Sequence, residues 1–111
     1  MEITIRIDDS ISIEIEHCSV WNTLFVEKVK DGEITDIIRL EKDEADIIIS
    51  NFFSSSSENI NSLFQNQGSK IRIAKDCDST AIIQHSDFVS IPVQFSDQFI
   101  EALKTLRLRM R

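Results

Sequence analysis

Apolar and polar residues alternate strictly at the start of the chain. Isoleucine occupies every second position from 3 to 7 and again from 11 to 15, with mostly polar residues between. A period of two predicts strands that bury one face, and Asp8-Asp9-Ser10 between the two runs favours a turn. We therefore predict a β-hairpin whose isoleucines face a core and whose Glu14 and Glu16 face water.

Five further segments carry strand patterns, at 21–30, 34–40, 70–75, 80–84 and 88–93. Asp31-Gly32 between the first two is a strong short hairpin signal. Residues 76–79 and 86–87 supply turn chemistry for the last three. The chain holds 19 isoleucines against 6 leucines, and side chains branched at Cβ suit a pleated surface. The composition therefore agrees with a strand-rich fold.

The apolar period changes to that of a helix in two places. Acidic residues crowd positions 41–46, where a helix N-terminus favours negative charge. Ser96 is expected to be the N-cap of the second helix. Leu106 and Leu108 cannot share one helix face. The last residues of the chain are therefore expected either to leave the helix or to bind a partner. The two predicted stripes are Ala45, Ile48, Ile49, Phe52 and Phe53, and Phe99, Ile100, Leu103, Leu106 and Met110.

These elements predict one α+β domain over residues 1–111. About seven strands in the order ββββα-βββα would form an antiparallel sheet, with two main helices packed on one face. A two-part plan is an open alternative: an acidic ββββα half (1–53), a Ser-rich linker that can hold a short helix (54–69), and a βββα half (70–111). Whether the halves arose by duplication also stays open.

The overall usage is that of a globular protein, with 41% hydrophobic and 28% charged residues. No apolar run exceeds three residues and no signal segment opens the chain, so we expect a soluble, cytoplasmic protein without a membrane span. The net charge is −7, divided as −8 over residues 1–53 and +1 over the rest. Such a field repels phosphate backbones and attracts basic proteins.

No residue pattern points to catalysis, a cofactor or a metal. His17 and Cys18 are neighbours, and neighbours in a strand point to opposite faces, so they cannot converge on one ion. His85-Ser86-Asp87 contains the three residue types of a hydrolase triad, but the side chains of a triad converge from separated segments of the chain. We therefore expect a protein that is not an enzyme and that uses no cofactor.

The acidic first half instead predicts protein binding. A non-enzymatic interaction module or inhibitor would dock another protein, basic or nucleic-acid-handling, through its acidic surface. Small acidic proteins without catalytic motifs are common among phage and mobile-element proteins that block such machinery, which makes an anti-defence inhibitor one expectation. A homodimer is also expected, because an open sheet leaves two edges to pair. The predicted protein-binding residues are Asp8, Asp9, Glu14, Glu16, Glu33 and Asp36.

An alternative function comes from the end of the chain. The strand Val89-Ser90-Ile91-Pro92-Val93 and the amphipathic helix after it resemble the strand-then-helix units of PUR-repeat and PC4-like proteins, over about the last forty residues. The resemblance implies single-stranded nucleic-acid binding, for which the candidate residues are Lys28, Lys30, Lys70, Arg72 and Lys75. Such sites need exposed aromatic rings flanked by bases. The chain has no tyrosine and one tryptophan, which favours the protein-binding interpretation.

Overall fold

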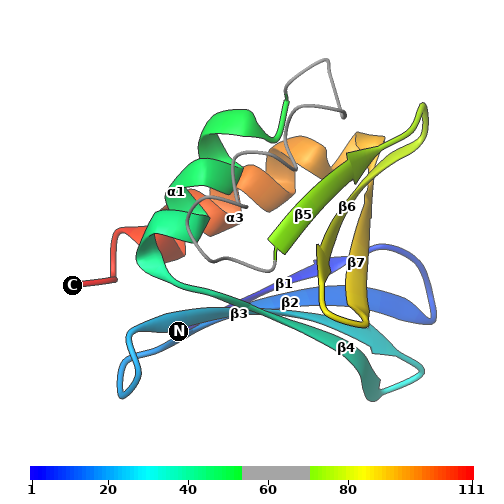
Figure 1. The fold of residues 1–111 in the computed structure, drawn as a ribbon. Coiled ribbons are helices and arrows are strands. Elements are labelled where there is room, and N and C mark those ends of the chain that lie inside the picture. The colour runs from blue at the N-terminus through cyan, green and yellow to red at the C-terminus, as the bar shows by residue number, and fades with distance from the viewer. Residues whose placement is uncertain (54–70) are drawn as a thin grey trace.

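The computed structural model describes residues 1–53 and 71–111 of the chain. Within these residues, seven antiparallel strands and two helices follow one another as ββββα-βββα, which confirms the predicted α+β class (Figure 1). The predicted serine linker and its short helix lie outside these residues. In chain order the elements are β1 (Glu2–Arg6), β2 (Ile11–Cys18), β3 (Thr23–Lys30), β4 (Glu33–Leu40), α1 (Lys42–Asn51), β5 (Ile71–Lys75), β6 (Ser79–Gln84), β7 (Asp87–Pro92), the 3-10 turn η1 (Val93–Phe95) and α3 (Ser96–Arg107).

The strands form two sheets rather than one. Sheet A has the order β1-β2-β3-β4 and sheet B the order β5-β6-β7. Sheet B stands at an angle beside the β4 edge of sheet A, and both helices lie over the inner face of sheet A (Figure 1). Strand patterns reveal which face of a strand is buried, but not which strand edges pair. The single sheet expected from the sequence is therefore corrected to a four-stranded and a three-stranded sheet.

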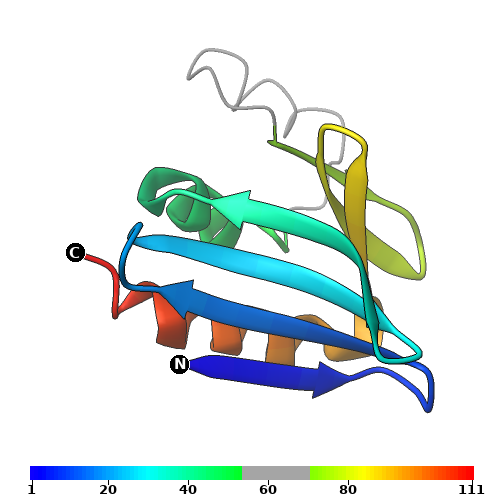
Figure 2. The same ribbon diagram turned by 90° about the horizontal axis from the view of Figure 1, so that it is seen from below.

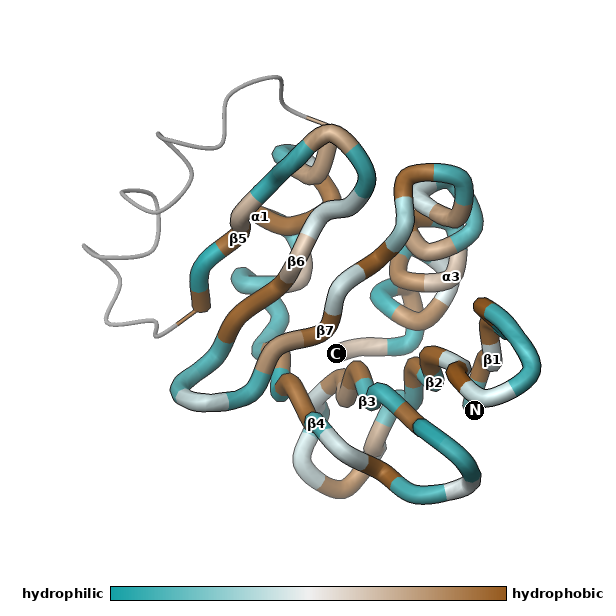
Figure 3. The backbone as a smooth tube through the Cα atoms, turned by 90° about the vertical axis from the view of Figure 1, so that its right-hand side faces the viewer, coloured by the Kyte–Doolittle hydropathy of each residue, from teal (hydrophilic) through white to brown (hydrophobic). Residues whose placement is uncertain are grey.

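The alternating isoleucines face the core, as predicted. Ile5, Ile13 and Ile15 are 5% exposed or less, and apolar and polar positions alternate along the strands (Figure 3). Isoleucines and a valine of sheet B join the same core, together with the helix residues Ile48, Phe99 and Leu103. The outer face of sheet A carries no described element over it (Figure 2).

The helix ends differ in part from the prediction. α1 begins with a capping box, in which the backbone N–H of Glu41 donates to Glu44 Oε1 over 2.8 Å. Ser96 is the first residue of α3 and not its N-cap, because the turn η1 leads directly into the helix. α3 ends at Arg107, so Leu108 lies 85% exposed while Met110 returns to the core. This departure from the helix resolves the conflict between Leu106 and Leu108.

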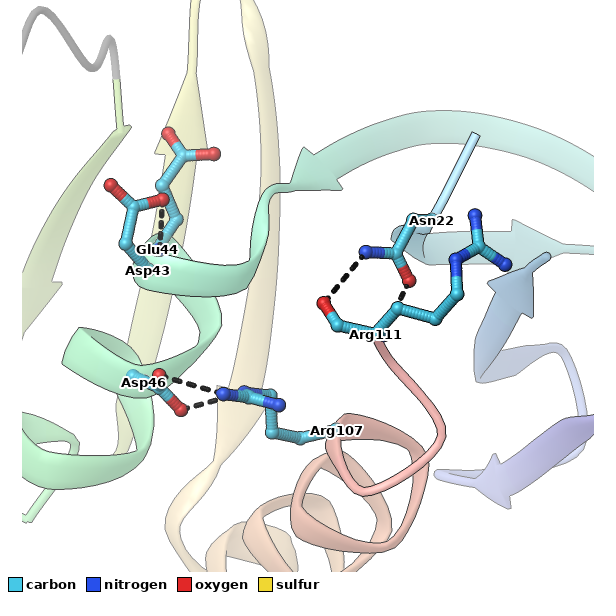
Figure 4. Close-up of polar contacts among 6 residues, drawn as sticks. All are labelled: Asn22, Asp43, Glu44, Asp46, Arg107 and Arg111. Carbon is cyan, nitrogen blue, oxygen red and sulfur yellow. Dashed lines mark hydrogen bonds and ion pairs between the residues drawn. The ribbon is translucent and has the colours of Figure 1, made fainter. Parts of the chain in front are cut away.

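Side-chain contacts fix the two helices and the chain end (Figure 4). Arg107 of α3 pairs with Asp46 of α1 through two bonds, Nε to Oδ1 at 2.7 Å and Nη2 to Oδ2 at 3.0 Å. Arg111 donates its backbone N–H to Asn22 Oδ1 over 2.9 Å, and Asn22 Nδ2 donates to the backbone oxygen of Arg111 over 3.2 Å. None of the described helices is long and apolar enough to cross a membrane.

Candidate functional site

The register of sheet A arranges its outward side chains in rows. Residues directly opposite each other on neighbouring strands share a face, so each row crosses all four strands. The two central rows are Glu2, Glu16, Phe25 and Arg39, and Thr4, Glu14, Glu27 and Ile37. Four of these eight side chains are carboxylates from three adjacent strands. We call Glu2, Glu14, Glu16 and Glu27 the acidic cluster.

The carboxylates of the acidic cluster crowd one another. One oxygen each of Glu2, Glu16 and Glu27 lies within 4.8 Å of the other two, and Glu14 faces Glu27 across β2 and β3. Burial raises the pKa of the Glu27 carboxyl, and the neighbouring glutamates raise it further. Among the residues that the structure describes, none of the four forms an ion pair. The cluster is therefore a local excess of negative charge.

This arrangement can hold a cation. Carboxylate oxygens accept charge-assisted hydrogen bonds from a guanidinium or an ammonium group, and they also coordinate hard metal ions such as Ca²⁺. The oxygens of Glu2, Glu16 and Glu27 are close enough to act on one cation together. A basic side chain of a partner is thus a chemically suitable ligand.

An aromatic group flanks the acidic cluster at the β4 side. Trp21 lies in the turn between β2 and β3, is 64% exposed, and has its ring centroid 6.5 Å from that of Phe25. The guanidinium carbon of Arg39 lies 5.8 Å from the Trp21 ring centroid and 5.6 Å from that of Phe25. Asn22, next to Trp21, is tied to the chain end at Arg111. The exposed tryptophan therefore sits on a fixed turn beside the carboxylates.

The other end of the outer face is hollowed between two hairpin turns. The hollow has a volume of about 370 Å³ and is lined by residues of both turns, Asp8, Asp9 and Asp31 among them. Asp8 Oδ1 accepts the backbone N–H groups of Ser10 and Ile11 at 2.8 Å each, and these bonds lower the pKa of the Asp8 carboxyl. Asp8 and Asp9 are both exposed, and Asp8 also stabilises its own turn.

Glu33 and Asp36, the other two predicted protein-binding residues, lie away from the acidic cluster. Glu33 is exposed at the start of β4. Asp36 is opposite Lys28, which is itself opposite the buried Ile13, so Asp36 points to the inner side of sheet A. There its Oδ1 accepts the backbone N–H of Phe88 over 3.2 Å. The structure brings Glu14 and Glu16 together, but it does not bring Asp36 to them.

Sequence reasoning missed two members of the acidic cluster and the adjacent tryptophan. Glu2 alternates with the inward isoleucines in the same way as Thr4 and Arg6, so the pattern of the first strand predicts that Glu2 lies on the outer face. The sequence gives a weaker signal for Glu27, because Phe25 and Val29 make the alternation of the third strand irregular. The strand predicted over residues 21–30 included Trp21, but β3 begins at Thr23 and Trp21 lies in the preceding turn, where Asn22 adopts a positive φ of 51°.

The candidate nucleic-acid residues are divided between the two sheets. Lys28 and Lys30 belong to β3, and Lys28 Nζ lies 5.7 Å from the ring centroid of Phe88. Arg72 and Lys75 belong to β5, where burial lowers the pKa of the Lys75 ammonium group. Lys70 lies outside the described residues. The structure does not gather the four placed residues on one strand or one sheet.

The histidine and cysteine candidates have separate surroundings. His85 occupies the β6–β7 turn with a positive φ of 57°, and Asp87, two residues further on, accepts the backbone N–H of Ile37 over 3.4 Å. Cys18 and Cys77 are both free thiols. His17 Nε2 is buried and has no hydrogen-bond partner in the part of the chain that the structure describes.

The outer face of sheet A is thus the place where charge and exposed aromatic surface coincide. The acidic cluster, Trp21 and the hollow all belong to this face. No described element lies over it (Figure 2). No model of a known protein family matches the chain, and no curated protein sequence is significantly similar to it.

Proposed function

We propose that this chain is a non-enzymatic protein-interaction module that binds a basic partner through the acidic cluster and Trp21. The observation that carries the proposal is the cluster itself, four carboxylates that face water on one sheet without an ion pair in the described chain. A partner that inserts arginine or lysine here relieves the repulsion among the glutamates and gains charge-assisted hydrogen bonds.

The neighbouring aromatic surface supports the same function. Tryptophan and arginine are enriched among the residues that carry most of the energy of protein interfaces. Trp21 and Arg39 lie in the same region of the outer face as Glu16, whose cross-strand neighbour is Phe25. An apolar contact on Trp21 together with a basic contact on the carboxylates would give both affinity and orientation.

The charge pattern indicates what kind of protein the partner is. A surface that attracts the acidic cluster is one that also attracts nucleic-acid phosphates. We therefore propose an inhibitor that occupies the basic, nucleic-acid-binding surface of its partner. Electrostatic attraction of this kind raises the association rate and weakens as salt is added.

An oligoarginine peptide tests the binding face directly. In a titration followed by NMR, the amide resonances of Glu14, Glu16 and Glu27 should shift most. Glu14→Lys combined with Glu16→Lys should raise the dissociation constant about tenfold or more. The matched control is Asp78→Lys combined with Glu101→Lys, which changes the net charge equally at two exposed sites elsewhere. Equal weakening by both pairs would mean that only total charge matters, and it would overturn the proposed site.

The tryptophan provides a second, uncharged test. Trp21→Ala should weaken binding of a peptide that alternates arginine with leucine by about fivefold or more, because the apolar contact is lost. Val20→Ala, in the same turn and even more exposed to solvent than Trp21, should change the affinity by less than about twofold. If Trp21→Ala leaves the affinity unchanged, the aromatic part of the proposal is wrong.

Single-stranded nucleic-acid binding is the alternative function. The contact between Lys28 and the half-exposed ring of Phe88 is the feature that favours it, since a ring beside a base is a stacking site. Fluorescence anisotropy with labelled oligonucleotides across a salt series distinguishes the two functions. Binding that falls steeply with salt and is lost in Phe88→Ala would favour this alternative. No binding at low salt would dismiss it.

A further inference from the structure

Sheet A ends at β1, and no described element lies beyond that strand (Figure 2, dark blue). β1 pairs with β2 on one side only. Natural proteins protect such edges with charged side chains, proline, a bulge or a charge that points inward. β1 has no proline, bulge or inward charge, because its inward residues are Ile3 and Ile5 and its register with β2 is regular. Its edge charges are the outward Glu2 and Arg6, which are of opposite sign.

The hydrogen-bond pattern shows which backbone groups of β1 face outward. His17 donates its N–H to Met1 O over 3.1 Å, and Ile7 donates its N–H to Ile11 O over 2.9 Å. In an antiparallel ladder the bonded pairs alternate with non-bonded pairs, so the odd-numbered residues of this strand bond to β2. The N–H and C=O groups of Glu2, Thr4 and Arg6 therefore point away from the sheet.

We propose that this edge pairs with the same edge of a second copy of the chain. The two β1 strands would run antiparallel, with the two-fold axis at Thr4. In this register Glu2 lies opposite Arg6 of the partner subunit, and Arg6 lies opposite Glu2 of the partner subunit. Three bonded pairs form, and each exchanges two N–H···O bonds, so about six backbone bonds join the subunits. The edge is complementary to itself in both shape and charge.

The inward side chains fit the same register. Ile3 lies opposite Ile5 of the partner subunit, and Met1, which is 57% exposed in one copy, lies opposite Ile7 of the partner subunit. Apolar cross-strand pairs stabilise a sheet. Ile3 and Ile7 are only partly buried within one copy, so the pairing covers apolar surface that the single chain leaves accessible.

Other antiparallel registers are less favourable. An axis at Glu2 places two glutamates opposite each other, and an axis at Arg6 places two arginines opposite each other. Like charges directly opposite on neighbouring strands are destabilising. An axis at Ile3 or Ile5 forms two bonded pairs instead of three and separates Glu2 from Arg6. The axis at Thr4 is the register in which backbone, charge and apolar pairing agree.

The dimer would be a continuous sheet of twice four strands. Both acidic clusters would then lie on the same outer face, on either side of the axis. The inference does not rest on the proposed function, because the β1 edge alone carries it and its test is the oligomeric state. Glu2 belongs to both the edge and the acidic cluster, whereas Glu14, Glu16 and Glu27 lie on β2 and β3.

Sedimentation equilibrium is the first test. The chain has a mass of 12.8 kDa, so the wild type should approach twice that mass at high micromolar concentration. Thr4→Pro removes the N–H on the axis without removing a bond to β2, and it should raise the dimer dissociation constant about a hundredfold. Thr4→Val keeps the N–H and should change it less than about threefold.

A charge exchange is the second test and does not depend on how well the proline variant folds. Glu2→Arg alone and Arg6→Glu alone each put like charges opposite each other, and each should weaken self-association about tenfold. A mixture of the two variants should restore association, because every cross-strand pair is then of opposite charge. The double variant Glu2→Arg with Arg6→Glu should also dimerise.

Three results would overturn the proposal. The first is a wild type that stays at 12.8 kDa at high micromolar concentration, which would leave the edge for a strand of another protein or for none. The second is a dimer that persists in a folded Thr4→Pro variant, since another surface would then join the copies. The third is a mixture of the charge variants that associates no better than either alone.

Discussion

The two edges of sheet A differ in whether their outward backbone groups are hydrogen-bonded. At β4, the side chain of Gln84 accepts the backbone N–H of Arg39 over 2.9 Å and donates to the Arg39 carbonyl over 2.8 Å. Asp87 accepts the next outward N–H, that of Ile37. At β1, the corresponding groups of Thr4 have no partner among the described residues. One edge is closed by side chains, and the other keeps its donors and acceptors available.

The closed edge also explains why the strands form two sheets. A side-chain amide can satisfy an edge residue without adding a strand, because it offers both N–H donors and a carbonyl acceptor, as a neighbouring strand would. Gln84 and Asp87 flank the β6–β7 turn, so this hairpin meets β4 through side chains and not through a ladder. Sheet A is therefore complete at four strands on this side, and β1 is the edge left for association.

Proline at the two edges should give the largest difference in stability. Arg39→Pro removes an N–H that Gln84 accepts, and we expect the free energy of unfolding to fall by about 2 kcal/mol. Thr4→Pro at the open edge removes no internal bond and should lower it by less than about 1 kcal/mol. Urea denaturation at low protein concentration, where self-association contributes least, measures both.

Arg39→Ala is the control for this comparison, since it removes the contacts of the guanidinium with Trp21 and Phe25 but keeps the backbone N–H. If Arg39→Pro were no less stable than Arg39→Ala, the hydrogen bond from the Arg39 N–H to Gln84 would contribute nothing to stability. The β4 edge would then not be closed by side chains.

Removal of the amide side chain should have a smaller effect. Gln84→Ala leaves both backbone groups of Arg39 to water, and we expect a loss of about 1 kcal/mol. Hydrogen exchange should show faster exchange at the Arg39 amide, close to the rate of the Thr4 amide in the monomer. Gln98→Ala on the exposed side of α3 is the matched control and should leave the free energy of unfolding and the exchange rate of the Arg39 amide unchanged. Unaltered exchange at Arg39 would contradict the assignment.

The smallest effect concerns the acidic cluster beside the open edge. Because the pKa of Glu27 is raised in the folded protein, its ionised form opposes folding, and the wild type gains stability as the pH falls through that pKa. Glu27→Gln should therefore stabilise the protein at pH 7, by only a few tenths of a kcal/mol because Glu27 is only partly buried and solvent screens its repulsion by the neighbouring glutamates. The difference should vanish near about pH 3, below the ordinary pKa of glutamate.

Thermal unfolding across this pH range measures the effect. Glu33→Gln, which changes an exposed carboxylate at the start of β4 away from the acidic cluster, is the control and should alter the stability little at either pH. A Glu27→Gln variant that is less stable than wild type at pH 7 would show that the carboxylate has a favourable partner.

Periodicity predicted much of the fold but only part of the candidate site. The alternating isoleucines correctly indicated which face of β1 and β2 is buried, and with it the outward positions of Glu14 and Glu16. The site extends further because registers between strands bring Glu2 and Glu27 to the same place. Asp36 was assigned to the acidic surface because its charge is visible in the sequence, while its face depends on the register with Lys28.

The sequence by itself determined the order of the elements and the buried face of each strand, because periodicity acts locally and each apolar side chain must leave water. Only the tertiary structure decided that seven strands divide into two sheets, that carboxylates of three strands meet, and that β1 stays open. These features depend on contacts such as that between Gln84 and Arg39, 45 residues apart in the chain, which no local pattern encodes.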